Sequence, residues 1–150
     1  MRPPFDFIYF LATGGWVGAS LFVILAVPLL RRRLGEAAAW DVSRTLLPLL
    51  DLFGTWAGTL AALSLWLGKE PGINAPWAVS MGLLAVMVTF ALYHRAVLVP
   101  SLDSAFRRLG EGDEQAQWRE EWSFLERMSL CLRYGTLLAG VATIVLGSEA

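Results

Sequence analysis

The fold is decided by the stretch Phe5 to Arg33, FDFIYFLATGGWVGASLFVILAVPLLRRR, in which a long apolar run is closed by three arginines. An apolar helix of roughly 20 residues, rising ~1.5 Å per residue, crosses the ~30 Å hydrocarbon core of a bilayer. The run is too long for the apolar part of a cleaved signal peptide, and arginines stand where a small-residue cleavage site would lie. It therefore predicts a retained membrane-spanning helix over residues 5–30.

Three further apolar stretches follow, at 46–67, 76–99 and 128–146. With 56% hydrophobic residues and a mean hydropathy of +0.55, the chain is more apolar than a water-soluble domain of its length. The sequence predicts an all-α fold, an integral membrane four-helix bundle that forms a single transmembrane domain over 1–150. Its expected surroundings are the lipid bilayer, and the net charge of −1 gives no indication of a nucleic-acid partner.

Arginines mark one side of the predicted bundle. The opposite side has only Arg2 and Lys69, so the positive-inside rule places the basic segments in the cytoplasm and both termini outside. Lys69 is the only lysine, and this preference for arginine favours a GC-rich bacterial source, hence the bacterial inner membrane. The arginines of the two basic segments are Arg31, Arg32, Arg33, Arg44, Arg107, Arg108, Arg119 and Arg127.

The second basic segment predicts helices of its own. Residues 101–109 are typical of a short helix stopped by Gly110 and Gly112. Further on, Trp118, Trp122 and Leu125 recur at helical spacing, and glutamates fill much of the remainder. This pattern predicts a cytoplasmic amphipathic helix that lies on the inner leaflet and runs into the fourth span. A docking face for a partner is the alternative, because a glutamate-rich surface is poorly suited to anionic lipid.

Small residues spaced four apart allow membrane helices to approach closely. We expect these pairs to pack the bundle within one chain, while dimerisation is the alternative that the motif leaves open. The pairs are Gly14 with Gly18 in the first stretch, Gly54 with Gly58 in the second, and Gly135 with Ala139 in the fourth.

Charged side chains inside the apolar stretches are the most informative feature, because an ionised group at the bilayer centre costs at least about 2.5 kcal/mol. They are Asp51, Arg95 and Arg133, and the predicted topology brings all three towards the cytoplasmic leaflet. We expect Asp51 to lie between the two arginines in one compensated cluster. The cluster serves either as a structural clamp or as a substrate or ion site.

His94 is the only histidine, and its place next to Arg95 predicts an interfacial polar residue. The alternative is an axial ligand to haem or a chlorin pigment, which would need a second histidine from a dimer or a methionine. Cys131 is the only cysteine, so no multi-cysteine metal site is expected. Phosphate loops, nucleophile elbows and metal-ligand spacings are missing, and the sequence therefore predicts no enzyme, no metal site and no resident cofactor.

Several short segments, in order along the chain, resemble the TMEM205-like family, also called DUF4149. They are Phe22 to Arg33 (FVILAVPLLRRR), Leu46-Leu47-Pro48, the segment at Pro100, and Phe124 to Ser129. The resemblance implies a small four-helix membrane protein and no enzyme class. The polar residues that the family pattern implies are replaced near Arg127 and Arg133, which puts a shared polar site in doubt.

The first stretch is also similar to copper-resistance D-like membrane proteins around Trp16-Val17-Gly18. It contains no histidine, so copper or haem ligation of that type has no visible ligand set.

Taken together, these patterns favour a non-enzymatic accessory or assembly subunit of a larger membrane complex, or a homo-oligomer. Two alternatives belong to other classes of protein. One is a haem- or pigment-binding redox protein that uses His94, and the other is a small-solute or metal-ion transporter whose path is lined by Asp51 and the arginines.

Overall fold

The computed structural model describes residues 3–68, 75–109 and 115–147, and all of these except Gly35 and Gly68 lie in helices. Four helices are long and apolar enough to cross a membrane, as the sequence predicts. Arg2, Lys69, Gly110 and Gly112, which entered the topology and helix-end predictions, lie outside the described residues. The elements are α1 (Pro3–Leu34), α2 (Glu36–Leu67), α3 (Ala75–Tyr93), the π-helical segment η1 (His94–Leu98), α4 (Val99–Leu109) and α5 (Gln115–Gly147).

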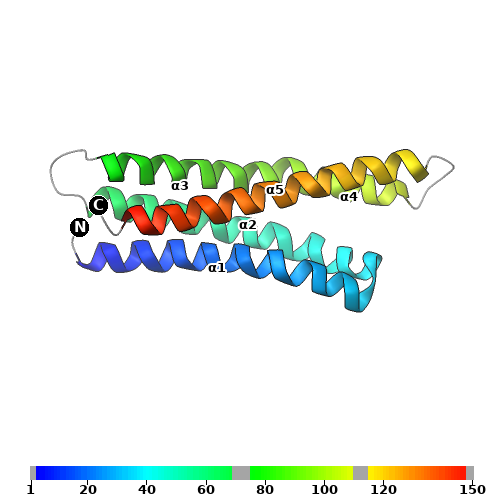
Figure 1. The fold of residues 1–150 in the computed structure, drawn as a ribbon, viewed down its shortest axis with the longest axis horizontal. Coiled ribbons are helices and arrows are strands. Elements are labelled where there is room, and N and C mark those ends of the chain that lie inside the picture. Colours follow the sequence, from blue (N-terminus) through cyan, green and yellow to red (C-terminus); the bar gives the residue numbers. More distant parts are fainter. Residues whose placement is uncertain (1–2, 69–74, 110–114, 148–150) are drawn as a thin grey trace.

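The helices form an antiparallel bundle (Figure 1). Helix α1 packs on α2, α2 on α3, α3 on α5 and α5 on α1, so each rod contacts two neighbours. Helix α4 continues the third rod and packs against α5. Figure 1 places the start of α1 and the end of α5 at one end of the bundle, and the turn between α1 and α2 at the other. The basic residues at the end of α1 and the end of α4 therefore gather at the same end of the bundle.

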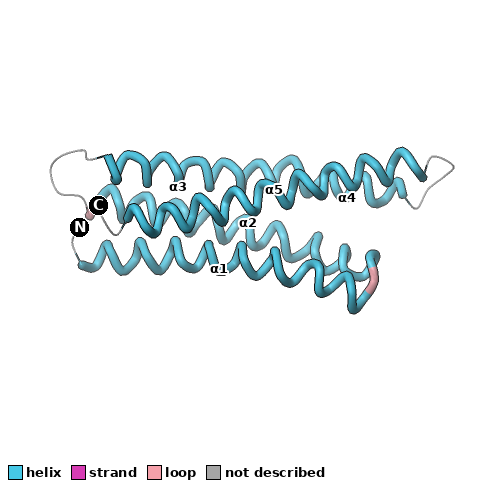
Figure 2. Tube along the Cα trace, viewed as in Figure 1, coloured by secondary structure: helices cyan, strands magenta, loops and turns pink. Residues whose placement is uncertain are grey.

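The turn between α1 and α2 consists of a single residue. Gly35 alone separates the two helices, and Figure 2 shows this turn as a short loop between α1 and α2. Its φ of 83° lies in the left-handed region, which a side chain would strain. The Gly35 amide donates to the carbonyl of Arg31, which ends α1 with a bond inside the turn. This glycine therefore sets the antiparallel start of the bundle.

The rods are longer than the apolar stretches that predicted them. Helices α2 and α5 have 32 and 33 residues, which corresponds to about 50 Å against ~30 Å of hydrocarbon. The excess lies at the arginine-bearing end, where a separate cluster holds the helices together. In this cluster Trp40 of α2, Leu102 and Ala105 of α4, and Trp122 of α5 are buried together.

This cluster corrects the prediction for the amphipathic segment. Helix α5 is one unbroken helix, and Trp122 is only 5% exposed rather than turned towards headgroups. Leu125 packs on the same cluster, and the guanidinium of Arg108 lies over the ring of Trp118. The physical reason is that α4 offers an apolar face of its own, so the tryptophan-bearing face of α5 is covered by protein.

Glycine packing follows the prediction in α2 and α5 and departs from it in α1. A Cβ added at Gly54 or Gly58 would collide with the indole of Trp16, and one at Gly135 would lie 3.3 Å from Phe90. These glycines therefore admit bulky aromatic rings from neighbouring helices. At Gly14 and Gly18 a Cβ would meet nothing within 4 Å. The expectation that this pair packs the bundle within one chain is wrong, because no described residue approaches closely enough to require a glycine at either position.

A π-helical turn interrupts the third rod just before Pro100. The amide of Val99 donates to the carbonyl of His94, five residues earlier. Proline has no N–H to offer the carbonyl of Ala96, and its ring would clash with that carbonyl in an α-helix. The wider turn relieves this clash without ending the helix, which continues as α4 to Leu109. It also places His94 at the start of the irregular segment.

Candidate functional site: a buried Asp–His–Ser–Arg cluster

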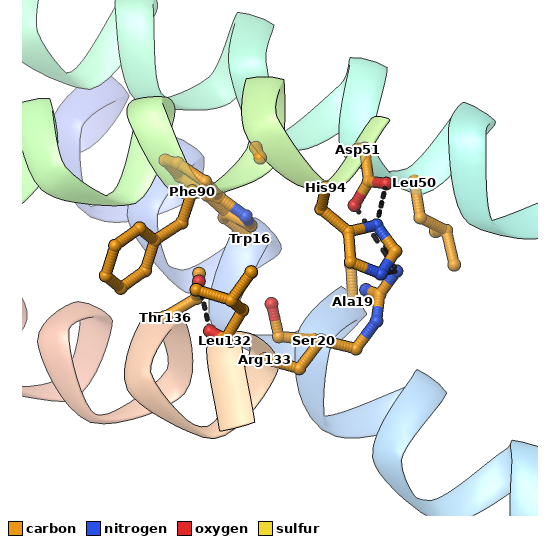
Figure 3. Close-up of a pocket in the computed structure, with 11 residues that line it drawn as sticks. Trp16, Ala19, Ser20, Leu50, Asp51, Phe90, His94, Leu132, Arg133 and Thr136 are labelled. Carbon is orange, nitrogen blue, oxygen red and sulfur yellow. Dashed lines mark hydrogen bonds and ion pairs between the residues drawn. The ribbon is translucent and has the colours of Figure 1, made fainter. Parts of the chain in front are cut away.

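A cluster of four polar side chains is buried in the arginine-bearing half of the bundle. Asp51 comes from α2, His94 from η1, and Ser129 and Arg133 from α5. Their exposed fractions are 6%, 2%, 7% and 8%, respectively. Ser129 and Arg133 are four residues apart and therefore share one face of α5. Figure 3 shows Asp51, His94 and Arg133 pointing towards one another from these three elements.

His94 is held at both ring nitrogens. Its Nδ1 lies 2.6 Å from Asp51 Oδ2, and its Nε2 lies 2.5 Å from Ser129 Oγ. In the neutral ring, Nδ1–H donates to the carboxylate and Nε2 accepts from the serine hydroxyl. In the protonated ring, both nitrogens donate and the hydroxyl rotates to accept. The imidazole is therefore hydrogen-bonded in either protonation state.

Arg133 supplies the positive charge that a buried carboxylate needs. Its Nη2 donates to Asp51 Oδ1 over 3.3 Å, and the same nitrogen lies 3.3 Å from His94 Nδ1. With a neutral imidazole, one carboxylate and one guanidinium balance to zero net charge. Protonation of His94 would place two positive groups beside one carboxylate.

The structure brings Asp51 and Arg133 together, as the sequence suggested, but Arg95 does not join them. Arg95 is exposed, and His94 occupies the position that we expected Arg95 to fill. Successive residues on a helix point in different directions, and here His94 faces the interior while Arg95 faces outwards. The prediction that Arg95 completes the cluster is therefore wrong.

The interpretation of His94 as an interfacial residue is also wrong, because its side chain is almost completely buried. The haem or chlorin alternative does not fit this geometry either. Both ring nitrogens already have partners in Asp51 and Ser129, so neither is free to coordinate a metal ion. Among the described residues, no group of three histidine, cysteine or carboxylate side chains could hold a metal ion.

Ser129 was missed in the sequence, although a signal for it exists. It precedes Arg133 by one helical turn, and a charged residue inside an apolar helix directs attention to its i−4 neighbour. For His94 the signal is Pro100, which predicts irregular backbone about one turn earlier in the helix.

Two small cavities border the cluster. One, of about 20 Å³, is lined by Asp51, His94 and Arg133 together with Trp16, Ser20 and Thr136 (Figure 3). The other, of about 40 Å³, is lined by Ser129 and Arg133 and extends to Arg31 and Glu126. Arg133 borders both cavities. The polar cluster thus borders two cavities, each large enough for a water molecule.

The order Asp51, His94, Ser129 is also the order of a hydrolytic triad, in which the histidine activates the serine. Ser129 lies in the middle of α5, and the helix uses the nearby backbone N–H groups for its own hydrogen bonds. No pair of free N–H groups is therefore available beside it to stabilise an oxyanion. The arrangement is better suited to passing a proton between hydrogen-bonded groups than to attacking a carbonyl.

No protein-family model, curated protein or solved structure matches this chain. The resemblance to the TMEM205-like family and the similarity to copper-resistance D-like proteins therefore stay predictions. A function has to be proposed from the chemistry of the buried cluster, since a four-helix bundle by itself indicates none.

Proposed function

We propose that this chain is a proton-coupled membrane transport protein in which His94 takes up and releases the proton. The observation that carries the proposal is the burial of His94 between Asp51 and Ser129, inside a rod of membrane-spanning length. Ionisable groups at such depth are rare and are typical of ion and proton pathways. Imidazole is also the side chain that most readily exchanges a proton near neutral pH.

The cluster provides what a proton-exchanging site needs. Ser129 can turn its hydroxyl from donor to acceptor, so His94 keeps its hydrogen bonds through the cycle. The cavities on the two sides of the cluster offer places for water that delivers or receives the proton. Arg133 borders both cavities, so a small displacement of its guanidinium would change which of the two cavities this group faces. This supports a role in transport rather than a purely structural clamp.

The proposal includes an orientation. The arginine-bearing end of the bundle lies in the cytoplasm of a bacterial cell, and both termini lie on the outer side of the inner membrane. Support comes from the basic last turns of α1 and α4, which gather at one end. The extensions of α2, α4 and α5 around Trp40 and Trp122 then form a cytoplasmic cap on the membrane-spanning part.

A second candidate function is that of an accessory subunit of a larger membrane complex, or of a homo-oligomer. Gly14 and Gly18 of α1 favour it, because a Cβ added at either would meet nothing within 4 Å among the described residues, which leaves room for a helix of another chain. This candidate involves no chemical reaction and no resident cofactor. Native gel electrophoresis from mild detergent tests it, since a monomer in wild-type protein and in Gly14→Leu alike would contradict it.

Proton flux into sealed vesicles tests the main proposal. Purified protein is reconstituted into vesicles that enclose a pH-sensitive dye. An outside-acid pH step drives proton entry, with equal potassium chloride on both sides and valinomycin present to hold the membrane potential at zero. We expect wild-type protein to acidify the interior, and His94→Gln and Asp51→Asn to reduce the rate at least tenfold. Arg95→Gln is the matched control, because Arg95 is an exposed neighbour outside the cluster. Equal rates in wild type and His94→Gln would overturn the proposal.

A further inference from the structure

The larger of the two cavities, which we call the indole cavity, has a distinctive lining. Trp40 of α2 and Trp122 of α5 form part of its wall. The other polar side chains of the lining are Arg31, Ser43, Glu126, Ser129 and Arg133. Valines and leucines supply most of the remaining surface: Val23, Val27, Leu47, Leu102 and Leu130. A polar ligand in this cavity would meet a few directed groups in otherwise apolar surroundings.

The two indole N–H groups of this cavity lack acceptors. Nε1 of Trp40 and Nε1 of Trp122 are both buried, and neither has a hydrogen-bond partner among the described residues. The two side chains are only 5% exposed. Buried N–H groups without an acceptor are uncommon in native proteins and need an explanation. Here the two tryptophans that carry them line the same cavity, which indicates that an acceptor other than the described residues completes it.

The other polar groups of the lining are already engaged. The guanidinium of Arg31 pairs with the carboxylate of Glu126 and lies over the ring of Trp122. The hydroxyl of Ser43 donates to the carbonyl of Ala39, and Ser129 bonds to His94. Glu126 uses one carboxylate oxygen for this ion pair, so the Arg31 and Glu126 charges balance each other. The N–H donors of the lining that have no acceptor are the two indole groups, and a ligand that completes them must accept hydrogen bonds.

Charge decides what kind of acceptor fits. Protonation of His94 leaves the cluster with two positive groups, His94 and Arg133, against the single carboxylate of Asp51. A negative ion in the adjacent cavity, beside Arg133 and Ser129, would restore neutrality. The apolar walls disfavour multiply charged, strongly hydrated anions. A volume of about 40 Å³ also limits the ligand to a few heavy atoms.

We infer that the indole cavity binds a small monovalent anion, of the size of chloride, nitrate or acetate. This inference rests on the proposed function, because the anion is the partner that moves with the proton of His94. One proton and one monovalent anion together carry no net charge, so the pair crosses the cluster without leaving a buried charge uncompensated. Trp40 and Trp122 bind the anion through their indole N–H groups, and Arg133 couples it to His94.

Anion binding to purified protein in detergent is the test. Sodium chloride, nitrate and acetate are each titrated at constant ionic strength against sodium sulfate, and thermal stability and tryptophan fluorescence are recorded. We expect saturable binding of at least one monovalent anion, and at least tenfold weaker binding in Trp40→Phe and Trp122→Phe. Trp56→Phe is the matched control, because Trp56 lies on α2 with 64% of its surface exposed.

A measurement on the wild-type protein covers the case in which these variants fail to fold. The chain has 7 tryptophans, so its ¹H–¹⁵N spectrum should contain a small set of indole resonances. We expect two of them to shift with saturation as the monovalent anion is added, and none to shift with sulfate. Absence of any saturable shift would mean that water alone fills the cavity, and would overturn the inference.

The inference and the proposed function can fail separately. If no monovalent anion binds while proton flux still depends on His94, the anion site is wrong and the proton site stands. If anions bind through Trp40 and Trp122 but proton flux is unchanged in His94→Gln, the proton site is wrong and so is its coupling to the anion.

Discussion

The two halves of the bundle are held together by different means. Towards the termini, Trp16 of α1 fits against Gly54 and Gly58 of α2, and the Tyr9 ring lies against Gly147. Towards the arginine-bearing end, Asp51, His94 and Arg133 join three helices through charge and hydrogen bonds. The first half is stabilised by the packing of aromatic rings against glycines, and the second by an ion pair and hydrogen bonds between buried polar side chains.

The difference teaches where the molecule can change state. Contacts between glycines and aromatic rings have one favourable arrangement, and no proton or ion alters them. The charged half has at least two hydrogen-bonded arrangements, because Ser129 can serve His94 as donor or as acceptor. We therefore expect the terminal half to act as a rigid frame and the charged half to respond to protons and ions.

Removing the carboxylate should break the charged half most severely. Asp51→Ala leaves Arg133 buried without its counter-ion, and we expect a loss of about 3–5 kcal/mol in the free energy of unfolding. Unfolding by denaturant in detergent micelles measures it. The loss in Asp51→Ala/Arg133→Ala should fall short of the sum of the single losses by at least about 1 kcal/mol. Additive losses would mean that the two side chains do not stabilise each other.

Filling the glycine surface should break the terminal half. A Cβ at Gly58 would collide with Trp16 and would lie 2.7 Å from Val88 Cγ2, so Gly58→Ala should lower the free energy of unfolding by about 1–3 kcal/mol. The matched control is Gly14→Ala, which meets nothing within 4 Å and should stay within about 0.5 kcal/mol of wild type. If both substitutions lowered the free energy of unfolding equally, the packing of Trp16 against Gly58 would not be what stabilises this half.

A smaller effect should follow from the loss of one hydrogen bond in the terminal half. The Tyr9 hydroxyl donates to the carbonyl of Thr143 over 2.6 Å and links α1 to α5. Tyr9→Phe keeps the ring and should lower the free energy of unfolding by about 0.5–1.5 kcal/mol. Proton flux in vesicles should be unchanged. A large loss of flux would show that the two halves are not separable.

The smallest effect is expected at Arg95. Its side chain is exposed beside the cluster, so Arg95→Gln should change the free energy of unfolding by less than about 0.5 kcal/mol. The same unfolding experiment measures it, with Arg133→Gln alongside. Comparable losses in the two variants would mean that Arg95 stabilises the fold as much as Arg133 does, and would contradict its place outside the cluster.

The sequence predicted the four rods well because apolar length is a property of each segment alone. It also singled out Asp51 and Arg133, since a charge inside an apolar run is visible without any knowledge of packing. The sequence could not show how far the helices continue past the membrane. That extension depends on the contact of Trp122 with Trp40 and Leu102, which lie on other helices.

The orientation of individual side chains was harder to predict. His94 and Arg95 are neighbours in the chain, and the sequence favoured the arginine as the member of the cluster although the histidine faces inwards. The rotation of that helix is set by the π turn and by its contacts with α2 and α5, neither of which is a local property. In the same way, the spacing of Gly14 and Gly18 matches that of Gly54 and Gly58, but only the second pair receives an aromatic ring.

The π turn at His94–Leu98 holds one residue more than the α-helical turn that would span the same ends. Deletion of a single residue there would leave an ordinary helical turn and keep Leu102 and Ala105 facing Trp40. Deletion of a residue in a regular part of the helix, by contrast, would rotate everything beyond it by about 100°. Over evolutionary time, the loss of one residue should therefore be tolerated better in the π turn than in the helices on either side of it.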